Sequence, residues 1–444
     1  MKFFKEIDLN KLMLIMTVSY FFIELFHLNN PLYSFNNFYE KLQIVDYFYL
    51  IVLFVFLIKF ITSNNKKDFF NLDAYEILPI LFLFFCIITS ILSSDGIPVS
   101  QLLKYGYLFS IFYIVRNLAI EGNNLRILVK SMFNILIIYF FVLLLAYVIA
   151  VTSKSPNFFV LYYEEFPYVE ELYRLKGGYN PTSKLLAFHL FLTTVLLYLF
   201  KDYLSDKKKF LLIFLIFILA LLTFSRAGLI VCLLSIYIFL RLLKSRYLVY
   251  CFVPILIFTI FSFEIFSLIF FEVNNSNFLC AQTFQPKEFN QRFGWFGQEF
   301  QCNIDLNANI YQDGYLILKL VGINAGFDNF FIGNGIGSYA QIWISASNNN
   351  LIPIEFLDYI FPLAQSTPVT LFAENGIIGL LIYMLFLFGS LSRRSNIFKN
   401  LDKFIICFSI FFVILNLDIQ NFRFLYFYLG IFYAYHYLRT KKLL

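Results

Sequence analysis

The sequence predicts an all-α polytopic integral membrane protein, with about twelve transmembrane helices and a large, partly helical loop between the ninth and tenth. The first observation is composition, since 60% of the residues are hydrophobic, 21% are aromatic and only 14% are charged. Ordinary soluble domains do not have this composition. The second is the recurrence of apolar runs of about 20 residues, the length that crosses a bilayer as a helix. The third is one long polar stretch, roughly Phe271 to Gln365, which is too long to be a simple connector.

The apolar segments follow one another through short connections, apart from that stretch. They lie near 11–27, 43–62, 77–93, 100–118, 130–151, 181–200, 210–224, 227–243, 248–271, 366–389, 403–419 and 423–438. No small-residue cleavage site follows the first segment, so we expect a retained helix rather than a signal peptide. Within 210–243 only Ser225-Arg226-Ala227-Gly228 interrupts the apolar run. Two spans that meet there fit the length better than one very long helix.

These segments divide the chain into three parts. Residues 1–271 hold the first nine helices and a smaller outer segment at 152–180. Residues 272–365 form the large loop, in which recurring aromatic residues predict an ordered cap outside the membrane. Residues 366–444 hold the last three helices and a cytoplasmic tail.

The placement of Lys and Arg predicts that both termini are cytoplasmic, because cytoplasmic connections carry an excess of these residues. With the N-terminus inside, the cytoplasmic segments carry Lys66, Lys67, Arg116, Arg126, Lys130, Lys201, Lys207, Lys208, Lys209, Arg241, Lys244, Arg246, Arg393, Arg394, Lys399, Lys403, Arg439, Lys441 and Lys442. The large loop then lies outside the cytoplasm. The net charge of +6 is small and follows this asymmetry, so it indicates membrane orientation and no nucleic-acid partner.

The cysteines and histidines predict neither a metal site nor a cofactor. Four of the six cysteines fall within predicted spans, where we expect them to pack. Cys280 and Cys302 lie in the outer loop, where they either pair as a disulfide or stay as free thiols, since sequence does not give their geometry. His27, His189 and His436 are far apart in the chain and lack metal-site spacing.

Basic residues on the outer side are the strongest functional signal. Arg174 and Lys176 directly precede a pair of glycines and a span, where they either anchor the chain at the interface or hold an anionic headgroup. Arg226 lies between two spans on the outer side, against the positive-inside preference, and charges near hydrocarbon are functional candidates. With Lys184 and Arg292, these cations would suit a lipid-linked phosphate or diphosphate if they converge, because guanidinium groups bind phosphate oxygens bidentately.

Four stretches, taken in chain order, give a family resemblance over roughly residues 174–390. The run Leu221–Leu229 contains Ser-Arg-Ala-Gly, Arg292 lies three residues before Trp295, and Gly333–Tyr339 reads Gly-x-Gly-x-Gly-x-Tyr. The run Glu374–Leu380 then reads Glu-x-Gly-x-x-Gly at a span. These stretches resemble the O-antigen ligase/polymerase superfamily, whose members also have about twelve spans and a large periplasmic loop.

The resemblance favours the Wzy-type polymerase branch of that superfamily. Ligases, which transfer finished glycan to lipid A-core, usually have a His-Asn pair about nine residues before the Glu-x-Gly motif. This sequence has Gln365-Ser366-Thr367-Pro368 there and no histidine in the outer loop. A ligase remains the alternative.

The resemblance implies a metal-independent glycosyltransferase that joins undecaprenyl-diphosphate-linked oligosaccharides at the periplasmic face of a bacterial inner membrane. It implies the membrane lipid as partner, with a chain-length regulator and a flippase as further partners. The expected catalytic residues are Arg226, Arg292 and Glu374. The expected substrate-binding residues are Arg174, Lys176, Lys184, Gly335, Gly337 and Tyr339. Glu374 has a second interpretation, in which it holds loop backbone or pairs with an arginine, and the glycines have one as ordinary turn residues.

A transporter or flippase is the alternative from another functional class, since twelve spans with internal charges also fit one. Transporters often contain internal repeats with broken helices in matching positions, and we find no such repeat in the sequence. They also seldom have an ordered outer cap of this size. A purely structural membrane protein would leave Arg226 without an explanation.

Overall fold

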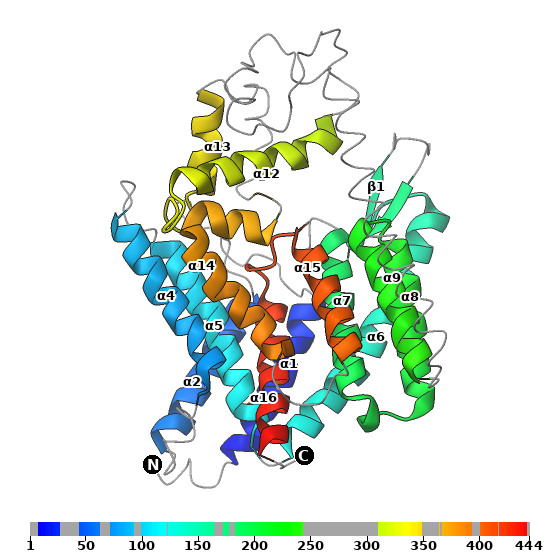
Figure 1. Ribbon diagram of the computed structural model, residues 1–444. Coiled ribbons are helices and arrows are strands. Elements are labelled where there is room, and N and C mark those ends of the chain that lie inside the picture. The colour runs from blue at the N-terminus through cyan, green and yellow to red at the C-terminus, as the bar shows by residue number, and fades with distance from the viewer. Residues whose placement is uncertain are drawn as a thin grey trace.

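The chain folds as a bundle of α-helices with a smaller helical layer at one end (Figure 1). The computed structural model describes residues 8–26, 44–62, 72–92, 99–121, 123–163, 172–176, 183–242, 310–348, 364, 366–392, 400–415 and 417–441. The α-helices are α1 (Leu9–Phe26), α2 (Ile44–Thr62), α4 (Ala74–Leu92), α5 (Val99–Ala119), α6 (Asn124–Ser153), α7 (Ser183–Leu199), α8 (Asp206–Leu222), α9 (Arg226–Leu242), α12 (Ile310–Asp328), α13 (Tyr339–Asn348), α14 (Thr367–Ser392), α15 (Asn400–Leu415) and α16 (Arg423–Thr440). A 3₁₀ turn (η2, Lys201–Tyr203) and an antiparallel hairpin of β1 (Val160–Tyr163) and β2 (Leu172–Leu175) complete the described elements.

The helices identify an all-α membrane protein. Within the described part of the chain, five helices are long and apolar enough to cross a bilayer, namely α1, α2, α4, α6 and most of α14. Three shorter apolar stretches lie in α7, α9 and α15. The predicted span 248–271 falls outside the described residues, and the expected number of about twelve spans remains a prediction.

Helix α16 lies at the centre of the bundle and packs along α5. Gly430 makes this contact close, because a Cβ there would lie 2.9 Å from the Phe112 carbonyl oxygen and 2.9 Å from Val115 Cβ. Small residues allow membrane helices to approach closely, which increases their van der Waals contact. The interior around α16 is rich in aromatic side chains, among them the buried Tyr426, Tyr428 and Tyr433.

Buried ion pairs tie the helices together at the end of the bundle where α16 finishes. Arg116 of α5 bonds Glu76 of α4 through Nε and Nη2, each at 2.9 Å, and both side chains are fully buried. Arg241 of α9 bonds Asp402 of α15, with Nε at 2.7 Å from Oδ1. A buried charge is tolerated when it is paired and hydrogen-bonded, so these pairs fix which helices are neighbours.

Two helices meet at the Ser-Arg-Ala-Gly stretch, as the sequence predicts. Helix α8 ends at Leu222 and α9 begins at Arg226, with a sharp turn between them. Phe224 has a positive φ of 43° in this turn, a backbone conformation that residues other than glycine rarely adopt.

Helices α12 and α13 form a layer across one end of the bundle, in the sequence range predicted to be the outer cap (Figure 1). They share a small hydrophobic core with the first half of α14, centred on Tyr339 and Trp343. This core is separate from the large core of the bundle.

Helix α14 differs from the continuous span expected at 366–389. Gly376 has φ 61° and ψ −169°, so the helix breaks there into two halves. The first half packs under α12, and the second half runs into the bundle beside α4 (Figure 1).

Candidate functional site

The two glycine motifs, at Gly333–Tyr339 and Glu374–Leu380, come together as a crossing of two backbones. A Cβ on Gly333 would lie 2.4 Å from the Glu374 carbonyl carbon and 2.4 Å from the Gly376 nitrogen. A Cβ on Gly376 would in turn lie 2.5 Å from the Phe331 carbonyl oxygen. Both glycines also have positive φ, so neither position suits another residue. We call this contact the glycine crossing, and it joins stretches that are about forty residues apart in the chain.

Hydrogen bonds across the glycine crossing fix the turn against the break in α14. The Asn334 N–H donates to the Ala373 carbonyl at 3.0 Å, and the Gly335 N–H donates to the Glu374 carbonyl at 2.8 Å. In the other direction, the Ile377 N–H donates to the Phe330 carbonyl at 2.8 Å. The carbonyl and N–H groups freed by the break at Gly376 are therefore satisfied by the turn, as buried backbone groups must be.

Glu374 holds loop backbone in this arrangement. Its carboxylate is almost fully buried and accepts hydrogen bonds from the N–H groups of Gly337 and Tyr339, the latter at 3.4 Å. These N–H groups lie at the start of α13, where the helix dipole favours a negative charge. This is the second of the two interpretations that the sequence allows for Glu374.

The neighbouring residues of the motif shape the turn and its core. Gly335 and Gly337 have φ values of 98° and 75°, which require glycine or carry strain. Tyr339, expected to bind substrate, is fully buried, and its hydroxyl donates to the Leu318 carbonyl of α12. Its position gives it a packing role in the core of the cap.

Three of the expected cations, Arg174, Lys176 and Lys184, lie in or beside the hairpin at the same end of the bundle. Arg174 in β2 donates from Nε to the Thr223 carbonyl at 3.1 Å and from Nη2 to the Phe224 carbonyl at 2.8 Å. These carbonyls close the end of α8, and Arg226 follows two residues later as the first residue of α9. Two stretches that sequence analysis selected separately are thus joined by one guanidinium group.

Two lysines lie in the same region. Lys176 follows β2 directly, and its N–H donates to the Phe159 carbonyl at 2.9 Å. Partial burial lowers the pKa of Lys176, and a partly desolvated cation attracts an anion more strongly than a hydrated one. Lys184 lies in the first turn of α7, a helix that contacts β2. We call the hairpin, these two lysines and the α8–α9 turn the hairpin site.

The hairpin site and the glycine crossing do not coincide. Figure 1 shows the hairpin and the α12–α14 contact on opposite sides of the bundle, at the same end. The turn that joins α15 and α16 is bonded to α14 through the Asp418 side chain, while α15 itself contacts α7 and α9. This part of the chain therefore touches helices that belong to both groups. The described site residues therefore form two groups, with Glu374, Gly335, Gly337 and Tyr339 near the glycine crossing and Arg174, Lys176 and Lys184 near the hairpin.

Asp418 in the α15–α16 turn was missed by sequence reasoning. Its Oδ1 accepts hydrogen bonds from Thr370 Oγ1 at 2.7 Å and from Gln420 Nε2 at 3.1 Å, and all three side chains are buried. The carboxylate also lies within electrostatic range of Glu374. An acidic residue at the end of a long apolar segment was the available signal, because such residues seldom occur there without a role.

Arg423 was also missed, since it opens the last apolar segment. Its guanidinium bonds Asp46 of α2 at 2.7 Å and Glu24 of α1 at 3.5 Å, which ties the start of α16 to two other helices. Tyr107 of α5 joins this group by donating to Asp46 at 3.2 Å. With two carboxylates around it, Arg423 serves helix packing.

Several expected features lie outside the described residues. Arg292, Cys280 and Cys302 fall in the part of the chain that is not described, and so does the side chain of Arg226. Within the described ranges, no group of three or more His, Cys, Asp or Glu side chains could hold a metal ion. His189 is buried, and its Nε2 lies 3.2 Å from the Tyr428 hydroxyl.

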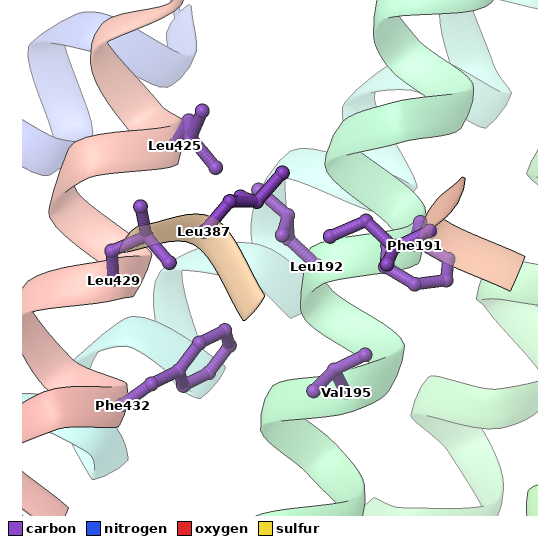
Figure 2. Close-up of a pocket in the computed structure, with 8 residues that line it drawn as sticks. Phe191, Leu192, Val195, Leu387, Leu425, Leu429 and Phe432 are labelled. Carbon is purple, nitrogen blue, oxygen red and sulfur yellow. The ribbon is translucent and has the colours of Figure 1, made fainter. Parts of the chain in front are cut away.

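A small crevice between α7, α14, α15 and α16 offers no polar chemistry. Figure 2 shows its lining side chains pointing toward one another across the gap. They are Phe191, Leu192, Val195, Leu387, Ile410, Leu425, Leu429 and Phe432, all apolar.

No protein-family model matches the chain, and no curated protein matches it either.

Proposed function

We propose that the chain is a membrane glycosyltransferase that polymerises undecaprenyl-diphosphate-linked oligosaccharide repeat units into a surface polysaccharide. In this proposal it works at the periplasmic face of a bacterial inner membrane, with both termini in the cytoplasm and no metal or other cofactor. The acceptor hydroxyl of one repeat unit attacks the anomeric carbon of the growing chain. The bond from that carbon to the diphosphate breaks, and undecaprenyl diphosphate leaves with the electron pair.

The observation that carries the proposal is the attachment of Arg174 to the turn that precedes Arg226. The two hydrogen bonds from its guanidinium bring the Arg174–Lys176 segment to the start of α9, beside the first turn of α7 with Lys184. Basic residues gathered at the end of a membrane bundle suit the headgroup of a lipid-linked diphosphate. Cations fixed near a leaving diphosphate also stabilise the charge that develops in the transition state.

In this proposal Arg226 and Arg292 contact the diphosphate, while Arg174 orients the turn that presents Arg226. Lys176 and Lys184 add positive potential around the headgroup. Glu374 acts as a positioning residue, because its carboxylate bonds the N–H groups at the start of α13. The acceptor hydroxyl loses its proton to a carboxylate or to water once the reacting groups are aligned.

The test is complementation of a deletion strain with the native chain, with Arg226→Ala or with Arg292→Ala, followed by gel analysis of extracted surface glycan. Arg439→Ala is the matched control, since Arg439 is an exposed arginine near the end of α16, at the other end of the bundle from the hairpin. We expect deletion to leave lipid A-core carrying a single repeat unit, and only the native chain and Arg439→Ala to restore the ladder.

Two other results would replace the proposal. Full-length polymer that accumulates on undecaprenyl diphosphate, unattached to core, would identify a ligase. Repeat units held at the cytoplasmic face would identify a flippase. Normal ladders from both arginine variants, at native protein levels, would remove the assigned site.

A further inference from the structure

The end of α12 and the turn after it expose large apolar side chains outside the helices of the bundle. Phe327 and Phe331 are 61% and 66% exposed, and Phe330 and Ile332 are 40% and 36% exposed. Isolated exposed apolar residues are ordinary, but four within six positions form a patch that calls for a partner. We call residues 327–332 the aromatic turn.

The aromatic turn is held in one arrangement by its surroundings. The Phe327 and Phe330 rings stack at 6.2 Å, and both pack edge-on against Phe372 of α14. The backbone is fixed by the bond from the Ile377 N–H to the Phe330 carbonyl and by the glycine crossing. The exposure of the patch is therefore a property of the fold.

Contacts with α14 and α4 establish the height of the aromatic turn along the bundle. The Phe331 backbone lies against Gly376, and the next residue back, Asn375, accepts a hydrogen bond from Cys86 of α4 at 3.3 Å. Helix α4 continues six residues beyond Cys86 to Leu92. At 1.5 Å per residue, α4 therefore rises about 9 Å above this level.

The part of α4 above that level is apolar and faces outward. Ile88, Ile91 and Leu92 are 42%, 63% and 64% exposed, on a helix apolar enough to span a bilayer. The second half of α14 continues the same surface below the aromatic turn through the exposed Ile378 and Leu381. In Figure 1 the turn after α12 lies near the upper part of α4.

We propose that the aromatic turn inserts into the lipid leaflet on this side of the membrane and anchors the α12–α13 layer to the bilayer surface. The occupant is lipid, because the patch is continuous with the lipid-facing surfaces of α4 and α14. Aromatic rings are favoured at the boundary between headgroups and acyl chains, and polar Asp328 and Asn329 lie within the same turn. Interfacial segments of this kind bury their apolar face about 5–10 Å into that boundary. This inference does not rest on the proposed glycosyltransferase activity.

The test places a tryptophan at the patch in the full chain, reconstituted in lipid nanodiscs. Phe331→Trp keeps an aromatic side chain at an exposed position, so the fold is retained. Gln341→Trp, at an exposed position of α13, is the control. The emission of the native chain, which has two tryptophans, is subtracted from each variant. We expect lipids brominated on their acyl chains to quench the tryptophan at position 331 several-fold more than the one at 341, with the reverse order for aqueous iodide.

Two outcomes would overturn the inference. Equal iodide quenching at the two positions would mean that the aromatic turn lies in water. Protection of position 331 from both quenchers would mean that protein, such as a second copy of this chain, covers the patch. Phe327→Trp repeats the measurement at the other exposed ring and guards against a defect specific to position 331.

Discussion

Replacing Gly333 by alanine tests the glycine crossing, which joins the outer cap to the break in α14. The new Cβ would lie 2.4–2.5 Å from backbone atoms of Glu374, Asn375 and Gly376. Carbon atoms in contact normally stay about 3.5–4.0 Å apart, so the two segments would have to separate. The obstacle is backbone on both sides, and no side chain can rotate away to relieve it.

The expected destabilisation follows from two terms. An L-residue in the left-handed region costs about 1–2 kcal/mol, and Gly333 has φ 71°. Overpacking a filled contact costs about 1–3 kcal/mol, which gives roughly 2–5 kcal/mol in all. Separating the segments relieves the overlap only by stretching the hydrogen bonds of Asn334, Gly335 and Ile377, each with a net contribution of about 0.5–1.5 kcal/mol.

Substitutions at two other glycines separate the backbone strain from the overpacking. Gly337 has φ 75°, but its added Cβ would meet only the flexible Gln101 side chain at 2.8 Å, so Gly337→Ala has the backbone strain without the crossing. Gly106 lies within α5 with nothing within 4 Å of an added Cβ, so Gly106→Ala has neither. Residual folded protein after heating in detergent, measured by size-exclusion chromatography, should give the lowest Tm for Gly333→Ala and an intermediate one for Gly337→Ala. Gly106→Ala should match or exceed the native chain. Equal Tm values for Gly333→Ala and Gly337→Ala would refute the close approach of the two backbones.

Substitutions at three further contacts are tested by the same Tm measurement. Arg174→Lys keeps the charge but loses the forked geometry that reaches two carbonyls at once. We therefore expect the free energy of unfolding to fall by about 1–2 kcal/mol and the ladder to weaken. An unchanged Tm would mean that Arg174 does not hold the α8–α9 turn. Arg116→Met and Glu76→Met should each lower the free energy of unfolding by about 3–5 kcal/mol, because each leaves the partner as an unpaired buried charge. The double variant should lose less stability than the sum of the two single variants. Additive losses would show that the two side chains do not interact. Asp418→Leu removes the acceptor of two buried donors and should lower the free energy of unfolding by about 2–5 kcal/mol. Asp418→Asn keeps Oδ1 and should lose less stability. Equal losses would show that the charge, rather than the acceptor atom, matters.

The sequence predicts the membrane class and the helices well, because both depend on apolar length and composition. The turn between α8 and α9 was also predictable, since Ser225–Gly228 is the one polar interruption of its apolar run. The break in α14 was not predictable. Gly376 lies in an otherwise helical stretch, and it adopts a non-helical conformation because the Phe331 backbone lies where its Cβ would be.

The candidate site was likewise predictable from the sequence only in part. Sequence patterns identified both glycine motifs but gave no reason to pair them, because the pairing consists of backbone contacts that leave no mark on residue type. The Arg174 and Arg226 stretches were selected separately by charge and position, and they are joined because Arg174 reaches the carbonyls of Thr223 and Phe224. Asp418 was overlooked because its partners come from α14 and its own turn, which only the fold brings together.

The two groups at this end of the bundle are both attached through buried contacts. The α12–α13 layer is fixed to α14 by the glycine crossing, by several backbone hydrogen bonds and by a hydrophobic core of its own. The hairpin is fixed by Arg174, which bonds two carbonyls of the α8–α9 turn, and by Val160 and Leu175, which lie in the large core of the bundle. Segments within a core open at higher free energy than those with few buried contacts, so the side chains of both groups keep their places in the fold.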